Sequence, residues 1–225
     1  MLDLETKTAC PLGATDCPVA EEVKKLREEC RRLKEITRYD ALTGLYNVGY
    51  LISALERELE RTRRTGLSTS LIMIDLDHFK KVNDTYGHEA GNTALIAFAD
   101  ILKKRLRKID IICRYGGEEF SVILPGTQLS HAISASERLR EDLENSPLYM
   151  SEGKIKLTAS FGVDSFSQDK GISAGKFIEK ADAYLLQAKK EGRNRICYDR
   201  KKMETADTEI TTEERSMLYS SSRGT

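Results

Sequence analysis

The sequence predicts an α/β protein in which helices flank a central mixed β-sheet, with one further helix at the N-terminus. Two observations carry this prediction. Leu71–Ile74 is a run of four apolar residues, as expected of a central strand buried on both faces. The mostly apolar runs Ile109–Ile112 and Phe120–Leu124 flank two glycines, Gly116 and Gly117, which indicates two strands joined by a hairpin turn.

The remaining elements follow from hydrophobic periodicity and from residues that begin or end helices. Helices are predicted at Asn47–Arg64 with an end at Gly66, at His78–Thr85, Glu89–Arg107 and Leu129–Glu144, and at Ala174–Glu191 with Gly192 as its stop. Strands are predicted at Ser70–Asp75, within the hairpin Ile109–Leu124, at Ile155–Val163 and at Arg195–Tyr198.

Four regions are expected along the chain. Residues 1–18 are a flexible segment, 19–38 an amphipathic or coiled-coil helix, 39–200 the folded domain, and 201–225 a disordered tail in which nine of 25 residues are Ser or Thr. The helix has a seam with alternating steps of 4 and 3, formed by Val19, Val23, Leu26, Cys30, Leu33 and Thr37. This seam is typical of a short parallel two-stranded coiled coil, and the alternative is an amphipathic helix packed on its own domain.

Composition limits the classes of function. Lys+Arg and Asp+Glu number 36 each, so no net charge indicates nucleic acid or membrane as a partner. No apolar run approaches the ~18 residues of a membrane span, and the acidic start is unlike a signal peptide, so a cytoplasmic protein is expected.

The five cysteines are irregularly spaced, which favours free thiols. Cys10 and Cys17 each precede a proline, where a metal or haem role competes with spectator thiols; Cys30 lies on the seam.

Three carboxylates indicate a cation site. Asp75 ends the buried strand, and Glu118 and Glu119 follow the two glycines of the hairpin. From adjacent strands these groups can converge on hard divalent cations, and an oxygen-only ligand set favours Mg²⁺ or Mn²⁺ over Zn²⁺. Two Mg²⁺ ions on three carboxylates are typical of phosphoryl or nucleotidyl transfer. The alternative is a solubilising turn.

Six motifs in order resemble the GGDEF-domain family of diguanylate cyclases, which condense two GTP into cyclic di-GMP and two pyrophosphates. The motifs lie within Asp40–Asn47, Asp75–Asp84, Gly87–Gly91, Gly116–Phe120, Ser160–Val163 and Ala181–Asn194, and the resemblance covers about Tyr39 to Asp199. It implies that 39–200 is a GGDEF catalytic domain, with a fold similar to the nucleotidyl-cyclases and polymerase palms. It also implies activity as a homodimer, because each domain binds one GTP.

The resemblance implies a role for each matching residue. Asp75, the Leu76 carbonyl, Glu118 and Glu119 hold two Mg²⁺ or Mn²⁺ ions, and either glutamate can deprotonate the attacking 3′-hydroxyl. The substrate contacts are Phe79, Lys80, Gly116, Gly117, Lys189 and Arg193, together with Asn83 and Asn92 at the base. For Lys189 and Arg193 the alternative is a solvated helix terminus favoured by the helix dipole.

Asn92 departs from the family, which usually has Asp at this position. A carboxylate accepts from both guanine N1–H and N2–H, whereas a carboxamide offers one acceptor and an NH₂ donor. One interpretation is relaxed specificity, with ATP used beside GTP and cyclic GMP-AMP as a product. The other is that Asn92 accepts from one guanine N–H while Asn83 holds the specificity.

Arg107-x-x-Asp110 stands at the family's offset before Gly116, which implies an inhibitory site for the cyclic dinucleotide product, with Arg138 as a further contact. Two rival functions remain open: a degenerate GGDEF domain that binds nucleotide without turnover, and a scaffold that acts only through its N-terminal helix.

Overall fold

The computed structural model describes residues 17–36, 38–150, 153–167 and 171–203, with only the backbone described at 30–36, 148–150 and 153. A six-stranded sheet has the order β1 (Tyr46–Asn47), β3 (Ile111–Arg114), β4 (Glu119–Leu124), β2 (Thr69–Leu76), β7 (Ala159–Phe166) and β8 (Ile196–Tyr198). The outer pairs β1–β3 and β7–β8 are parallel and the inner pairs are antiparallel, so the predicted mixed sheet is confirmed.

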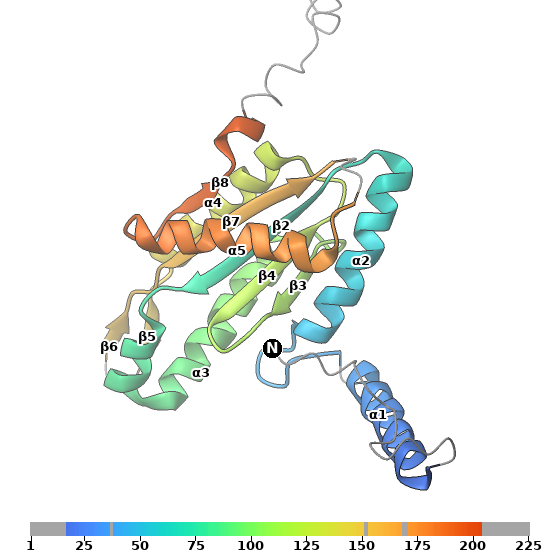
Figure 1. The fold of residues 1–225 in the computed structure, drawn as a ribbon. Coiled ribbons are helices and arrows are strands. Elements are labelled where there is room, and N and C mark those ends of the chain that lie inside the picture. The colour runs from blue at the N-terminus through green and yellow to red at the C-terminus, as the bar shows by residue number, and fades with distance from the viewer. Residues whose placement is uncertain (1–16, 37, 151–152, 168–170, 204–225) are drawn as a thin grey trace, which may run out of the picture.

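Helices cover both faces of the sheet (Figure 1). α2 (Val48–Thr65) and α5 (Ala174–Lys190) lie on one face, and α3 (Phe79–Arg105) and α4 (Leu129–Asn145) on the other. Strand β2 is buried along its whole length, and its side chains alternate between the two cores. Ile72, Ile74 and Leu76 pack toward α3 and α4, whereas Leu71 and Met73 pack toward α2 and α5. The prediction of a central strand is confirmed.

Gly162 in β7 allows α5 to lie directly on the sheet. A Cβ at this position would overlap the Ala181 carbonyl oxygen and the Leu185 backbone of α5. Because backbone cannot move aside as a flexible side chain can, α5 sits at one fixed height above β7. This close contact between α5 and β7 matters for the site, because the C-terminal turn of α5 carries the predicted cationic clamp.

One local prediction needs correction. The predicted strand Ile155–Val163 is split, since Ile155 ends β6 (Gly153–Ile155), which pairs with β5 (Leu148–Met150) in a separate ribbon. Residues 156–158 cross from this ribbon to the main sheet. The two helices predicted before and after residue 87 are confirmed as the two halves of α3, which are separated by the non-helical Gly87 with φ 81° and ψ 166°. The two-residue strand β1 and β5 were not predicted, because such short strands show no periodicity.

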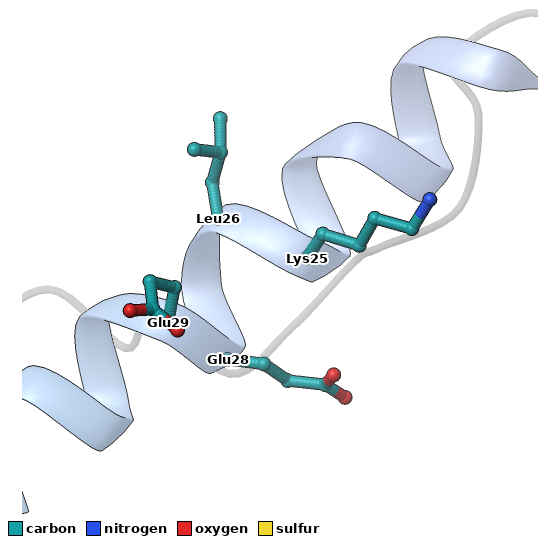
Figure 2. Close-up of a pocket in the computed structure, with 4 residues that line it drawn as sticks. All are labelled: Lys25, Leu26, Glu28 and Glu29. Atoms are coloured by element: carbon teal, nitrogen blue, oxygen red, sulfur yellow. The ribbon is translucent and has the colours of Figure 1, made fainter.

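The predicted N-terminal helix is present as α1 (Pro18–Ile36) and projects away from the sheet (Figure 1). The seam residues Val19, Val23 and Leu26 are 70%, 37% and 57% exposed. Figure 2 shows Leu26 projecting from α1 among the charged side chains of neighbouring positions. The described side chains of the seam are therefore exposed, and the coiled coil stays a prediction.

The ends of the chain are described in part. Residues 200–203 form a helical turn, in which Lys202 Nζ donates to the buried Asp164 Oδ1 at 2.6 Å. The predicted flexible segment lies outside the described residues up to 16, and the predicted tail lies outside them from 204. Cys17 is a free thiol, and Cys10 lies in the part that is not described. No helix in the described ranges has the length and apolar character needed to cross a membrane.

Candidate active site

The three predicted carboxylates meet at one edge of the sheet. Asp75 in β2 is the register partner of Glu119 in β4, and the Leu76 amide donates to the Glu118 carbonyl at 3.3 Å. The convergence expected from the sequence therefore follows from antiparallel pairing, which sets the end of β2 beside the start of β4.

The turn that carries Glu118 differs from the predicted one. β3 ends at Arg114 and β4 begins at Glu119, so the loop has four residues, and neither Gly116 nor Gly117 has a positive φ. A two-residue hairpin of the primed type would require positive φ. Gly116 serves a different purpose here, because a Cβ on it would lie 2.8 Å from Glu119 Oε2. Its missing side chain leaves room for the Glu119 carboxylate above the turn.

Negative charge exceeds positive charge at this edge. Burial raises the pKa of Asp75 although Lys189 Nζ lies 2.7 Å from Asp75 Oδ2, and Glu118 and Asp77 add repulsion. Burial also raises the pKa of Glu119, and the nearest carboxylate, Asp75, raises it further. Ionised carboxylates that are partly removed from water and close to one another favour the arrival of a cation.

The donor set suits Mg²⁺ or Mn²⁺, because Asp75, Glu118, Glu119 and the Leu76 carbonyl supply only oxygen. Within the described residues no three carboxylate, imidazole or thiol side chains stand close enough together to ligate one ion in their present positions. Lys189 takes the place of the cation on Asp75. The residues therefore fit a divalent metal in charge and chemistry.

The predicted phosphate clamp lies on two helix ends. Lys189 is in the last turn of α5, and Arg193 follows Gly192 with an exposed side chain that makes no hydrogen bond or ion pair within the described part of the chain. Phe79 and Lys80 begin α3 directly after β2, with Phe79 buried and Lys80 exposed. The first N–H groups of a helix lack intrahelical partners and favour anions.

The predicted base contacts lie on opposite sides of the α3 kink. Asn83 precedes Gly87, and Asn92 follows it. A Cβ at Gly91 would overlap the Asn83 carboxamide oxygen, so Gly91 lets that amide lie against the second half of the helix. The structure thus brings Asn83 beside the residue that precedes Asn92, and both asparagines are half-buried.

The predicted inhibitory residues Arg107, Asp110 and Arg138 line one cavity of about 130 Å³ at the opposite end of β3 from the glycine turn. Asp110 Oδ2 accepts from the Arg107 amide at 2.7 Å. Asp110 Oδ1 is buried and has no hydrogen-bond partner within the described residues, and burial raises the pKa of this carboxyl group. The cavity therefore contains a carboxylate oxygen that can accept a hydrogen bond from a bound ligand.

Sequence reasoning missed two supporting residues. Arg114 donates twice to the Gly117 carbonyl, at 2.8 and 3.1 Å, and once to each Asp40 oxygen at 3.2 Å, which ties the glycine turn to the first motif of the chain. Asp77 is 5% exposed and accepts three hydrogen bonds from distant segments. Asp77 stands inside one of the motifs and Arg114 just before another, but Asp40 is 74 residues from Arg114 and Asn194 is 117 residues from Asp77.

Comparisons with known proteins agree with this geometry. The profile described as "Diguanylate cyclase, GGDEF domain" matches residues 37–195. The response regulator PleD of Caulobacter vibrioides is 39% identical over 173 residues, which cover 76% of this chain and 38% of PleD. The diguanylate cyclase DgcP of Pseudomonas aeruginosa is 41% identical over 169 residues, which cover 75% of this chain and 24% of DgcP. The chain thus spans less than half the length of either relative.

Solved structures are similar in fold. Diguanylate cyclase SiaD of Pseudomonas aeruginosa, in complex with its activator SiaC, has a TM-score of 0.69 at 36% identity, covering 79% of this chain and 68% of SiaD. The structure of the coiled coil and GGDEF domain of DgcB from Caulobacter crescentus, in complex with c-di-GMP, has a TM-score of 0.69 at 28% identity. The match covers 80% of this chain and 95% of the DgcB chain. The fold, the ordered motifs and the profile match lead to one conclusion: this chain belongs to the GGDEF-domain family of diguanylate cyclases.

Proposed function

We propose that this chain is a diguanylate cyclase that condenses two GTP into cyclic di-GMP and two pyrophosphates. The observation that carries the proposal is the register pair Asp75–Glu119, with Glu118 beside it and Lys189 as the counter-charge. These groups belong to the motifs by which the chain resembles the family, and family membership supports the same reaction.

The residues divide the work of the reaction. Asp75, Glu118, Glu119 and the Leu76 carbonyl hold two Mg²⁺ ions, which offset the charge at the reacting phosphate when bound. Lys189 leaves Asp75 and, with Arg193, Lys80 and the first amides of α3, binds the triphosphate. Glu118 or Glu119 accepts the proton of the 3′-hydroxyl, whose oxygen forms the new bond to the α-phosphorus as pyrophosphate leaves.

A homodimer is part of the proposal, since each domain binds one GTP and the product joins two. The exposed seam residues Val19, Val23 and Leu26 would pair α1 with α1 of a second copy. The DgcB structure, which contains a coiled coil and a GGDEF domain in complex with c-di-GMP, supports this arrangement. It also supports product binding, which we assign to the cavity of Arg107, Asp110 and Arg138.

One assay tests the proposed function. The purified chain is incubated with Mg²⁺ and GTP, ATP, or both, and the products are separated by chromatography. Cyclic di-GMP and pyrophosphate in a 1:2 ratio are expected from GTP, and none without a divalent cation. A protein that binds GTP at the same concentrations but forms no cyclic product would instead be a nucleotide-binding module.

A second candidate function rests on Asn92, whose carboxamide presents a donor to adenine N1 as well as an acceptor. With equimolar GTP and ATP, cyclic GMP-AMP is then expected beside cyclic di-GMP. Asn92→Asp restores the double acceptor and should shift the mixture toward cyclic di-GMP by roughly tenfold or more, which corresponds to the ~1–3 kcal/mol of one bidentate pair. If both proteins form only cyclic di-GMP at high ATP, Asn92 is a tolerated variation.

A further inference from the structure

Asp77 is a buried carboxylate that the proposed reaction does not use. It follows β2 directly and is 5% exposed, two positions after the metal-site residue Asp75. No Lys or Arg is bonded to it among the described residues. Its hydrogen-bond partners are neutral groups, so its contribution differs from that of Asp75, which pairs with Lys189.

The Asp77 carboxylate joins three segments of the chain. Oδ1 accepts from the Ser160 hydroxyl at 2.7 Å, and Oδ2 accepts from the Thr158 hydroxyl at 2.8 Å. Oδ2 also accepts from the backbone N–H of Asn194 at 3.0 Å. The first two partners lie at the start of β7, whereas Asn194 belongs to the turn after α5.

That turn has an unusual backbone. Gly192, Arg193 and Asn194 have successive φ values of 112°, 63° and 46°. Left-handed conformations are disfavoured for residues with a side chain and persist only where the surroundings hold them. Here the Arg193 amide donates to the Ala188 carbonyl at 3.0 Å, and the Asn194 amide donates to Asp77.

The Asn194 side chain forms hydrogen bonds with α4, which lies on the opposite face of the sheet from α5. Its amide nitrogen donates to Glu144 Oε1 at 3.1 Å, and its carbonyl oxygen accepts from Arg140 at 3.1 Å. Asn194 is thus held from both sides, by Asp77 through the backbone and by α4 through the side chain. The neighbouring Arg193 guanidinium is exposed and makes no hydrogen bond or ion pair with the described residues.

We infer that Asp77 is a positioning residue for the phosphate clamp. By fixing the left-handed backbone at Asn194, it directs Arg193 toward the triphosphate bound beside Asp75 and Lys189. The inference rests on the proposed function, because it assumes that a triphosphate binds at this edge of the sheet.

A double-mutant cycle tests it through the binding of a GTP analogue that cannot be cleaved between the α- and β-phosphates, measured by calorimetry with Mg²⁺. Arg193→Ala should weaken binding about 10- to 100-fold, as expected for a charge-assisted hydrogen bond. Asp77→Ala should weaken it at least about fivefold. In the Arg193→Ala background, Asp77→Ala should change the affinity by less than about twofold, because both changes remove the same contact.

Two further variants separate positioning from a general loss of stability. Ser160→Ala removes a hydrogen bond from the other oxygen of the same carboxylate, and should lower the melting temperature while leaving the affinity within about twofold. Asp77→Asn retains an acceptor for the Asn194 N–H, while its NH₂ donates to the Ser160 hydroxyl, so it should also bind within about twofold of the wild type. If Asp77→Ala does not fold, Asp77→Ser replaces it, since its hydroxyl is too short to reach Asn194.

The outcomes are distinguishable. Losses that multiply in the double variant, or a Ser160→Ala loss as large as that of Asp77→Ala, would overturn the positioning role while leaving the proposed clamp intact. Unchanged binding by Asp77→Ala would do the same. Arg193→Ala with wild-type affinity would overturn the clamp itself and this inference with it.

Discussion

The two ends of the β3–β4 hairpin carry opposite kinds of incomplete site. At the turn, Glu118 and Glu119 lie beside Asp75, with Lys189 in ion-pair contact with Asp75. At the other end, Asp110 has one buried oxygen without a donor in the described chain, in a cavity that also contains Arg107 and Arg138. Burial raises the pKa of a carboxyl group at both ends.

The difference between the two ends lies in what each lacks. The turn has several carboxylates close together, so it lacks positive charge, which divalent cations supply. The Arg107–Asp110 end has cationic side chains and one buried carboxylate oxygen without a donor in the described chain, so the N–H groups and phosphates of the proposed cyclic dinucleotide would complement it. One four-residue strand, β3, separates the site proposed for metals from the site proposed for the product.

The largest expected effect is at the turn. Glu119→Gln removes a metal-ligand charge and should reduce turnover at least ~100-fold, a rise of ~2.7 kcal/mol in the barrier. Steady-state pyrophosphate release measures it, with Glu179→Gln on the exposed face of α5 as the matched control. If Glu119→Gln retains most of the wild-type rate, its assignment to the metal site is wrong.

A smaller effect is expected at the opposite end. Arg107→Ala should raise the concentration of cyclic di-GMP needed for half-inhibition by about 10- to 100-fold, because a charge-assisted contact is lost. The initial velocity should stay close to the wild-type value, since the cavity lies away from the carboxylates. Inhibition curves of the two proteins decide the point, and identical curves would remove this cavity from the regulatory scheme.

The N-terminal helix affects how often two active sites meet. Deleting residues 1–38 removes the seam and lowers the effective concentration of the second domain from the millimolar range of a short tether. Specific activity should then rise about tenfold with each tenfold increase in micromolar protein. Activity of the truncated protein that is both unchanged and independent of concentration would refute the role of α1.

The smallest effect is on stability. Burial and the Asp75 charge raise the pKa of Glu119, so its ionisation costs stability in the folded state. This cost is absent below the unfolded pKa of about 4.3 and present at pH 7. Without metal, Glu119→Gln should therefore raise Tm by roughly 1–3 °C at pH 7, on the scale of under 1 kcal/mol. The gain should vanish near pH 4; an equal gain at both pH values would point to another cause.

Sequence patterns predicted the central strand, because Leu71–Ile74 is an unbroken apolar run. They also predicted that its carboxylate meets those of the hairpin, because Asp75 ends one apolar strand and Glu118 and Glu119 precede another. They also indicated the Arg107–Asp110 pair through its offset from Gly116. They did not predict the four-residue turn, since two adjacent glycines suit several turn types and here one of them makes room for Glu119.

The supporting contacts were beyond local patterns for a physical reason. Arg114 and Asp77 are held by partners from other motifs, and Asp77 meets Asn194 in the turn after α5, the helix that lies directly on β7 at Gly162. Periodicity reports which face of an element is buried, but it does not report which distant polar group satisfies a buried carboxylate.

A crossed ligand-binding experiment tests the contrast between the two ends most directly. Tm is measured for the wild type, Glu119→Gln and Arg107→Ala, each with a non-cleavable GTP analogue plus Mg²⁺, or with cyclic di-GMP without metal. At about 100 times Kd each ligand should raise the wild-type Tm by roughly 5–10 °C. Glu119→Gln should lose the Mg²⁺-dependent part of the first shift and keep the second, and Arg107→Ala should do the reverse. If either variant loses both shifts, or if both variants keep both shifts, the account of two separate sites of opposite character is contradicted.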